Sequence, residues 1–310
     1  MRSIEIITIE SDFGAGKKGA KLGPQALVNL IKKNKIEPLW QANNLRIVAD
    51  DLEENIEYPF NKNIESIIEV QELAVEAIEK VLSNNLFPFI ISGDHSNGCA
   101  GISAIKNCYS DKRIGVIWID AHADLHSPFS TPSGNMHGMP LAAALAVNVL
   151  VEDANEVDED SIQLWQNLVN LGSKKIAPKI YPTDLVFIDL RDFEEDEEIL
   201  LKNMNITFFT PQDRMKKGIE SILEESINQL KECDLIYVSF DVDSLDPNIS
   251  IGTGTPVPNG LSENEAVYLL KNLLKNPKTV AFEITEINPL LDRENPMEEV
   301  SIRILEKVFA

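Results

Sequence analysis

The histidines and acidic residues of this 310-residue sequence gather in a few short segments whose spacing suits metal binding. Asp120, His122 and Asp124 stand at alternate positions, and Asp241 and Asp243 repeat that spacing later in the chain. In an extended chain, residues two apart project to the same side, so each set can converge on one point. The histidines of the chain all lie between positions 95 and 137, whereas random surface placement would scatter them. Most of them are therefore expected to be functional.

Carboxylates packed this densely repel one another and stay ionised only beside a compensating cation. The sequence places no Lys or Arg next to these segments, so the expected cation is a metal ion. Asp and His ligands without cysteine suit Mn²⁺, while Zn²⁺, Fe²⁺, Co²⁺ and Ni²⁺ are alternatives. A single carboxylate or histidine at a strand end is more often a turn residue or a helix cap. Two alternating sets in one chain favour a metal site.

Apolar, β-branched runs separated by amphipathic segments indicate the elements that must hold these side chains. The expected strands are 4–9, 45–49, 87–92, 114–119, 185–188, 206–209, 235–240 and 279–282. Several runs are apolar at nearly every position, which is typical of parallel strands covered on both faces. Helical periodicity predicts helices at 64–82, 219–230, 263–274 and 297–309, the third of them capped by Ser262. This alternation predicts an α/β protein with a mainly parallel sheet.

Polar segments directly follow four of the expected strands, at 92–96, 120–124, 241–247 and 283–289. Ligands of open parallel sheets bind at the carboxyl ends of the strands, so we expect these segments to meet at one edge. Acidic residues also fill 152–160 and 192–198, where solvated loops or helix starts are expected.

No linker rich in Pro, Gly or Ser divides the chain, which predicts a single domain over residues 1–310.

The composition is acidic, with 28 Lys and Arg against 50 Asp and Glu and a formal charge of −22. Such a surface should repel nucleic acid and anionic lipid.

No apolar run approaches the roughly 18 residues that a membrane span needs, and Glu5 and Glu10 interrupt the first apolar stretch. The three cysteines are an odd number without metal-ligand spacing, which argues against a disulfide framework. We expect a cytoplasmic protein without nucleic-acid or membrane partners.

Three of the polar segments together resemble the metal-binding signatures of the ureohydrolases, which include arginase, agmatinase and formimidoylglutamase. The matching motifs are Gly-Asp-His-Ser at 93–96, Asp-Ala-His-Ala-Asp at 120–124 and Ser-Phe-Asp-Val-Asp-Ser-Leu-Asp-Pro at 239–247. Their order and separation fit the family, so the resemblance covers nearly the whole chain. It implies a three-layer αβα sandwich with an eight-stranded, mainly parallel sheet.

Segments 133–140, 252–256 and 286–289 resemble the arginases in particular. The resemblance then implies hydrolysis of L-arginine to L-ornithine and urea by water activated at two Mn²⁺ ions per subunit. One ion would be held by His95, Asp120, Asp124 and Asp241, and the other by His122, Asp120, Asp241 and Asp243. Asp120 and Asp241 would bridge the pair. Family habit also implies a homo-oligomer, either a trimer or a hexamer.

The same resemblance assigns roles around the substrate. Glu286 would bind the guanidinium group, His137 would carry protons, and Asp124 is counted with them as catalytic. The substrate contacts would be His126, Ser133, Asn135, Glu194, Thr255 and Glu286. His126 and Glu194 depart from the arginase pattern, which usually has Asn and Asp at these places.

Several alternatives stay open from the sequence. The nearest is another ureohydrolase, acting on agmatine, a guanidino acid or formimidoylglutamate. A second is an inactive metal-binding scaffold or regulatory subunit. A third is a metal hydrolase built on a closed (β/α)₈ barrel, which also carries its ligands at strand ends.

Overall fold

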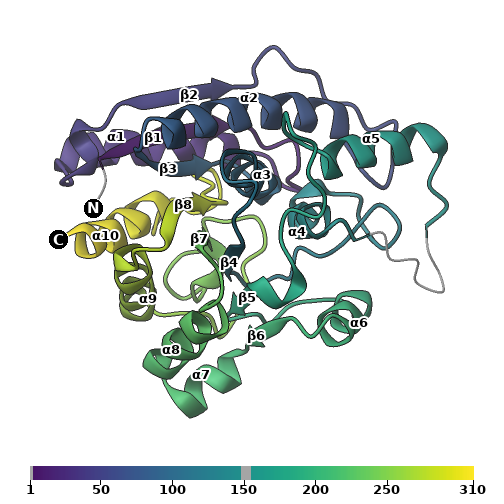
Figure 1. Ribbon diagram of the computed structural model, residues 1–310. Coiled ribbons are helices and arrows are strands. Elements are labelled where there is room, and N and C mark those ends of the chain that lie inside the picture. The colour runs from purple at the N-terminus through teal and green to yellow at the C-terminus, as the bar shows by residue number, and fades with distance from the viewer. Residues whose placement is uncertain (1–2, 148–154) are drawn as a thin grey trace.

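The computed structural model describes residues 3–147 and 155–310. Their strands form one open sheet in the order β2-β1-β3-β8-β7-β4-β5-β6 (Figure 1). In chain order the strands are β1 (Ile4–Glu10), β2 (Asn44–Val48), β3 (Phe87–Ser92), β4 (Ile114–Ile119), β5 (Leu185–Ile188), β6 (Thr207–Phe209), β7 (Leu235–Asp241) and β8 (Thr279–Thr285). Every pair of neighbouring strands is parallel. Because β2 and β6 each have one neighbouring strand among the described residues, the sheet is open and the barrel alternative is wrong.

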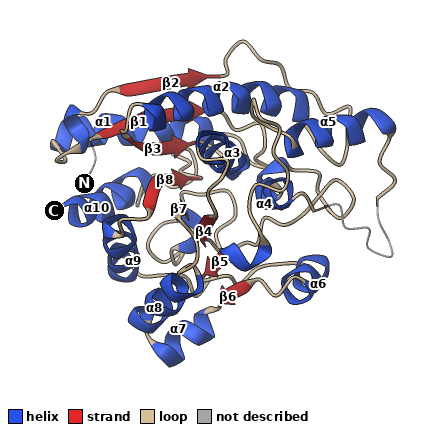
Figure 2. Ribbon diagram, viewed as in Figure 1, coloured by secondary structure: helices blue, strands red, loops and turns tan. Residues whose placement is uncertain are grey.

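Helices cover both faces of this sheet (Figure 2). They are α1 (Gly23–Asn34), α2 (Ile64–Ser83), α3 (Gly98–Cys108), α4 (Pro140–Leu145), α5 (Glu159–Val169), α6 (Glu195–Asn203), α7 (Pro211–Lys217), α8 (Ile219–Gln229), α9 (Glu263–Lys275) and α10 (Met297–Phe309). Buried residues of α2 to α6 share one core, and those of α1, α8, α9 and α10 share a second. The predicted three-layer αβα architecture is confirmed.

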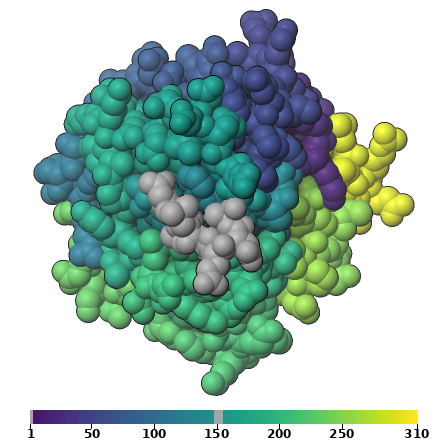
Figure 3. Space-filling view, turned by 90° about the vertical axis from the view of Figure 1, so that its right-hand side faces the viewer, coloured from purple at the N-terminus to yellow at the C-terminus, as the bar shows by residue number. Residues whose placement is uncertain are grey.

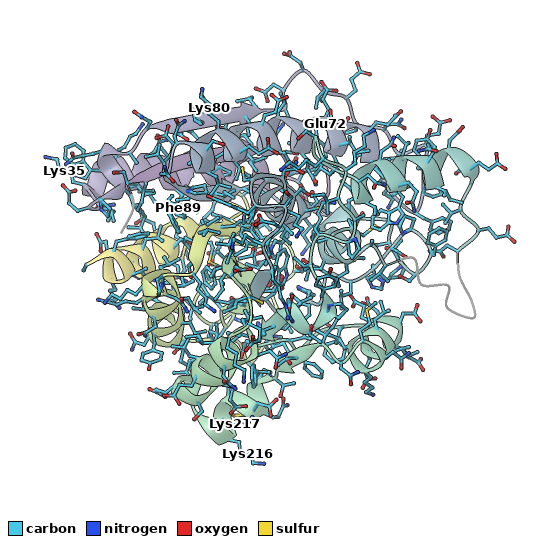
Figure 4. The ribbon with its side chains drawn as sticks, in the orientation of Figure 1. Lys35, Glu72, Lys80, Phe89, Lys216 and Lys217 are labelled. Atoms are coloured by element: carbon cyan, nitrogen blue, oxygen red, sulfur yellow. The ribbon has the colours of Figure 1, made fainter. Side chains whose placement is uncertain are left out.

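The central strands feed both cores because their side chains alternate between the two faces. In β4, Val116 and Trp118 belong to the first core, while Ile117 and Ile119 belong to the second. Phe89 of β3 points into the second core (Figure 4), where its ring stacks on another at a centroid distance of 5.2 Å. Burying each such side chain contributes about 1.5–3 kcal/mol, which explains the apolar runs in the sequence.

The predicted strands agree closely with the structure, with one informative difference. β8 extends to Thr285 rather than ending at position 282, so Glu283 lies inside a strand and is fully buried. The predicted cap of α9 is confirmed, since the Ser262 hydroxyl accepts a hydrogen bond from the Glu265 main-chain N–H. Among the described residues, no helix is both long and apolar enough to cross a bilayer.

The two acidic stretches are largely helix starts, as expected. Asp158 caps α5 by accepting from Ser161, and α6 begins at Glu195. Positions 152–154 of the first stretch lie outside the described residues.

The strands that precede the polar segments, β3, β8, β7 and β4, are adjacent at the centre of the sheet. The strand arrows point to the right-hand side of Figure 1, which Figure 3 turns toward the viewer. The middle of the chain, in teal and green, covers much of that side. The chain therefore assembles its polar segments at one edge of the sheet, as expected.

Candidate active site

Short turns at the ends of the central strands set the direction of the functional side chains. After β3, His95 begins a single 3₁₀ turn, which Asp94 caps by accepting from the Ser96 main-chain N–H at 2.9 Å. After β4, Asp124 adopts a left-handed conformation with φ 52°. Glu286 after β8 does the same with φ 65°. Non-glycine residues adopt this conformation at a cost, so surrounding contacts must hold it.

The first group of side chains surrounds the Nδ1 atom of His95. Carboxylate oxygens of Asp120, Asp124 and Asp241 lie 2.9, 3.1 and 3.1 Å from it. All four side chains are almost completely buried. The structure thus brings together the four residues that the resemblance assigns to one metal ion.

The geometry of this group fits a cation better than hydrogen bonding. His95 Nδ1, Asp120 Oδ2 and Asp124 Oδ2 are buried without a hydrogen-bond partner, although they lie so close together. Buried polar atoms normally find partners, and such orphaned atoms need an explanation. Imidazole and carboxylate ligands directed at one point match the donor set that Mn²⁺ and similar divalent ions accept.

A second group lies beside the first and shares Asp120 with it. His122 Nδ1 is 2.9 Å from Asp243 Oδ2 and 3.5 Å from Asp120 Oδ1. Because Asp120 directs one oxygen to each group, it is suited to bridge two ions. Asp241 directs one oxygen to the first group, while its other oxygen accepts from the Asp243 main-chain N–H at 2.7 Å. Its role as a second bridge therefore stays a prediction.

The electrostatics of the crowded acids show the same need for positive charge. Burial, with the nearby charge of Asp120, raises the pKa of Asp124 to about 6. Burial and the charges of Asp243 and Asp120 raise the pKa of Asp241 well above its usual value. Burial opposes ionisation of Asp120 too, yet His122 and His95 hold the pKa of that carboxyl below its usual range. A bound cation would favour the ionised form of every carboxyl here.

A buried hydrogen-bond chain holds the Nε2 atom of His95, on the side of the ring away from the acids. The sequence did not reveal this chain. His95 Nε2 lies 2.8 Å from the Ser239 hydroxyl, which donates to Glu283 Oε2 at 2.9 Å. Tyr237 and Ser92 donate to the same carboxylate at 2.6 and 2.7 Å. Partners of this kind fix the tautomer and orientation of a ligating imidazole. The sequence analysis placed Glu283 after the strand, and only the extension of β8 to Thr285 shows that it is a buried strand residue.

The Trp118 ring completes the support of His95. Its plane is stacked on the imidazole at a centroid distance of 4.0 Å and an interplanar angle of 6°. Gly98 makes room for this stacking, because a Cβ atom there would come within 2.5 Å of the Trp118 ring.

Glu286 and His137 form a pair beside His95. His137 Nδ1 is 3.2 Å from Glu286 Oε1, which also accepts from the His95 main-chain N–H at 3.0 Å. Burial would lower the pKa of His137, but the hydrogen bond to Glu286 raises it to about 9. No described residue donates to Glu286 Oε2, so this oxygen remains available to a ligand.

One cavity of about 300 Å³ connects these groups with the predicted substrate contacts. It is lined by all four histidines, by Asp124, Asp241 and Asp243, and by Ser133, Asn135, Glu194 and Thr255. An adjoining cavity of about 560 Å³ shares His122, His137 and Thr255 with it and is also lined by Glu286 and residues 15–17. Thr255 donates its hydroxyl to Asp243 Oδ2 at 3.1 Å, so it supports a candidate ligand.

Segment 59–62 fixes the loop that carries Ser133 and Asn135. Lys62 donates its main-chain N–H to Gly134 at 3.0 Å and its ammonium to the Ser133 carbonyl at 2.7 Å. Gly134 has φ 73°, and a Cβ atom there would lie 1.9 Å from the Pro59 carbonyl oxygen. Only glycine fits this approach.

His126 and Glu194 form a pair in the wall of the cavity, with His126 Nε2 2.9 Å from Glu194 Oε2. A third residue, Glu197, lies 3.6 Å from the same nitrogen and is 3% exposed. Burial raises the pKa of Glu197 to about 8. Sequence reasoning missed Glu197, although its spacing from Glu194 matches a capping box at the start of α6.

The sequence contains no arginine next to the acidic segments, but in the folded protein one arginine comes close to them. Arg191 reaches the site from the end of β5 and donates to the main-chain carbonyls of Asp243 and Val257 at 2.8 and 2.9 Å. It also pairs with Asp189 at 3.1 Å. Arg191 contacts the backbone of Asp243 rather than its carboxylate, so it anchors the segment without replacing a cation.

Comparisons with known proteins agree with the geometry. The family model described as the arginase family matches residues 2–310. An arginase of Staphylococcus aureus (strain MRSA252) is 33% identical over 315 residues, covering 99% of this chain and 97% of the relative. The crystal structure of Entamoeba histolytica arginase in complex with L-ornithine superposes with TM-score 0.86 at 26% identity, covering 100% of both chains. Formimidoylglutamase of Bacillus subtilis shares the fold, with TM-score 0.76 at 17% identity over 100% of this chain and 86% of that one.

Proposed function

The chain belongs to the arginase family and is a ureohydrolase, and from this premise we propose that it hydrolyses L-arginine to L-ornithine and urea. The observation that carries the proposal is the pair of acid–histidine groups that share Asp120 and line two adjoining cavities, one of which also contains Glu286. The matched relatives named arginases, including the one solved with L-ornithine, support arginine as the substrate.

Two Mn²⁺ ions are the proposed cofactors. His95, Asp120, Asp124 and Asp241 would hold one ion, and His122, Asp120, Asp241 and Asp243 the other. Such a pair lowers the pKa of bound water toward neutrality and so supplies a nucleophile. The orphaned oxygens and the absence of cysteine among these residues support a hard divalent ion over a thiolate-bound metal.

Glu286 orients the reacting end of the substrate. Its Oε2 atom accepts no hydrogen bond from any described residue, while Oε1 is fixed by His95 and His137. A carboxylate binds a guanidinium through charge-assisted hydrogen bonds, so Glu286 can hold the guanidinium carbon beside the two acid–histidine groups.

His137 carries the proton in this proposal. The ring is in hydrogen-bond contact with Glu286 and lines the cavity. With a pKa of about 9 it is protonated at neutral pH, so it can donate to the departing nitrogen of ornithine.

The outer part of the cavity would receive the amino-acid end of the substrate. Ser133 and Asn135 are suited to the α-carboxylate, while His126 and Glu194 form the opposite wall. Agmatine has no carboxylate, so these donors favour arginine over agmatine.

The cellular setting and the assembly are also proposed. The net charge of −22 supports a protein with neither nucleic-acid nor membrane partners, and three unpaired cysteines support a cytoplasmic location. A homo-oligomer, as a trimer or hexamer, is proposed from the family resemblance.

The test measures product release by manganese-loaded protein from three substrates: urea from L-arginine and from agmatine, and formamide from formimidoylglutamate. We expect arginine to be the preferred substrate, with two manganese ions retained per subunit. A preference for agmatine or formimidoylglutamate would replace arginase with another ureohydrolase activity. A metal content near one ion per subunit would exclude the proposed pair.

A further inference from the structure

The Gly-Asp-His-Ser segment contains an acid to which the proposed function gives no role. Asp94 directly precedes His95 at the end of β3, and its side chain is fully buried. It belongs to neither acid–histidine group. Burying a carboxylate is costly unless hydrogen bonds satisfy its oxygens, so the partners of Asp94 indicate what it does.

The two oxygens of Asp94 bind two different segments. Oδ1 accepts from the Ser96 main-chain N–H at 2.9 Å and so caps the turn that holds His95. Oδ2 accepts from the Gly14 main-chain N–H at 3.0 Å. Gly14 lies in loop 11–19, which follows β1 and reaches the end of β3 because the two strands are neighbours. Asp94 therefore joins the turn of His95 to a loop from another strand.

Gly14 extends this connection to His137. Its carbonyl accepts from the His137 main-chain N–H at 3.1 Å. His137 lies in a single 3₁₀ turn, Met136–Gly138, so the position of its main chain limits where the ring can point. A Cβ atom at position 14 would lie 2.5 Å from Asp94 Oδ1, and the contact thus needs glycine.

The loop is anchored on both sides of Gly14. The Asn63 side-chain amide donates to the Phe13 carbonyl at 2.8 Å, and the Lys17 ammonium donates to the Gly254 carbonyl at 2.6 Å. Loss of the Asp94 contact should therefore turn the segment at Gly14 rather than release the whole loop.

We propose that Asp94 is a positioning residue for the reaction: through Gly14 it fixes the main chain of His137 and holds the imidazole against Glu286. Asp94 itself would touch neither substrate nor the departing group. The inference rests on the proposed function, in which His137 carries the proton.

The first experiment compares Asp94→Asn with wild-type protein, both loaded with manganese, using arginine as substrate. An amide keeps one acceptor oxygen but directs an NH₂ group at the other main-chain N–H, so one of the two contacts is lost. We expect kcat to fall by about 10- to 100-fold, because a displacement of about 1 Å costs that much rate. KM should stay within about threefold, since the proposed substrate contacts are unchanged. A wild-type kcat in folded, manganese-containing Asp94→Asn would overturn the inference.

A double-mutant cycle tests whether Asp94 acts through His137. The proton carrier is already absent in His137→Asn, so adding Asp94→Asn to it should lower kcat by less than about threefold. Manganese per subunit should be equal in all four proteins of the cycle. A purely structural residue would lower kcat by the same factor in both backgrounds, and that result would overturn the inference.

Gly14→Ala disturbs the same contact from the other side and keeps the charge of Asp94. The added methyl group must push Gly14 and Asp94 apart, since it would lie 2.5 Å from Oδ1. We expect kcat to fall by about tenfold or more, and this effect to disappear in the His137→Asn background. Gly14→Ala decides the question if Asp94→Asn loses manganese, because position 14 is far in the sequence from the proposed ligands.

The control is Glu54→Gln, which breaks an exposed pair with Lys18 of the same loop and should keep the wild-type kcat. Circular dichroism establishes that each variant is folded before rates are compared. Wild-type protein that hydrolyses arginine, with a kcat that neither Asp94→Asn nor Gly14→Ala changes, would overturn the inference alone. Wild-type protein that hydrolyses no guanidino substrate would overturn the proposed function and this inference with it.

Discussion

Glu286 Oε1 accepts a hydrogen bond from the main-chain N–H of His95, at a distance of 3.0 Å. The residue proposed to bind the guanidinium group is therefore fixed to the backbone of a proposed metal ligand. The two residues are far apart in the sequence and meet because β3 and β8 are neighbours in the sheet. This contact couples the position of the substrate carbon to the position of the first acid–histidine group.

Glu286→Gln should abolish most activity without removing metal. The amide cannot form the charge-assisted pair with a guanidinium group, so kcat/KM for arginine should fall by about 100-fold or more. Metal content, measured by atomic emission after gel filtration, should stay at the wild-type value. Glu263→Gln, which changes only a surface pair with Arg303, serves as the control. Wild-type kcat/KM in Glu286→Gln would exclude its role in binding substrate.

Asp120→Asn should weaken both metal positions, because Asp120 contributes an oxygen to each group. Asp243→Ala should affect the second position alone, since Asp243 faces His122. We expect manganese per subunit after dialysis to fall toward zero in Asp120→Asn and toward half the wild-type value in Asp243→Ala. Asp234→Asn, in an exposed pair with Lys112, is the matched control. Retention of the full metal content by Asp120→Asn would contradict a shared ligand.

Glu283→Gln should weaken the metal held at His95 by about 10- to 100-fold, the effect usual for a residue that orients a ligating imidazole. The measurement is a manganese titration that follows tryptophan fluorescence, to which Trp118, stacked on His95, contributes. Tyr237→Phe removes one donor to Glu283 but keeps the contact with Ser239, so its effect should be smaller. Equal metal affinities in wild-type protein and Glu283→Gln would exclude the positioning role.

His137 should make the stability of metal-free protein depend on alkaline pH. Burial lowers its pKa and Glu286 raises it, with a net increase to about 9 from about 6.5 when unfolded. A histidine whose pKa is raised on folding stabilises fully below the unfolded value, and this contribution disappears as pH rises through about 9. The expected size is on the order of 1–3 kcal/mol. The difference in Tm between wild-type protein and His137→Asn should therefore shrink between pH 7 and pH 10, and a constant difference would contradict the shift.

Asp189→Asn should destabilise the fold by about 3–5 kcal/mol, because it leaves the buried Arg191 guanidinium without its carboxylate partner and Arg214 with Glu265 alone. Asp189 is fully buried and pairs with Arg214 at 2.7 Å and with Arg191 at 3.1 Å. Urea unfolding monitored by circular dichroism measures the change. Glu225→Gln breaks an exposed pair with Lys217 and should cost less than about 1 kcal/mol. Similar losses in the two variants would indicate that the buried pair contributes little.

The sequence by itself determined the sheet and the candidate metal ligands. Runs that are apolar at nearly every position are typical of strands covered on both faces of a sheet, so the positions of these strands could be predicted from the sequence. Alternating acids and histidines at the ends of those runs were visible for the same reason, because extended chain gives them a fixed direction. The family resemblance then assigned the candidate ligands and substrate contacts.

Only the tertiary structure decided which residues support the site from other parts of the chain. From the sequence, Glu283 is only the first residue of the polar segment 283–289, and its partner Ser239 depends on the pairing of β7 with β8. The His126–Glu194 pair depends on where α6 begins relative to the end of β4. Contacts between distant segments follow from packing, which local periodicity does not encode, so these pairs became visible only in three dimensions.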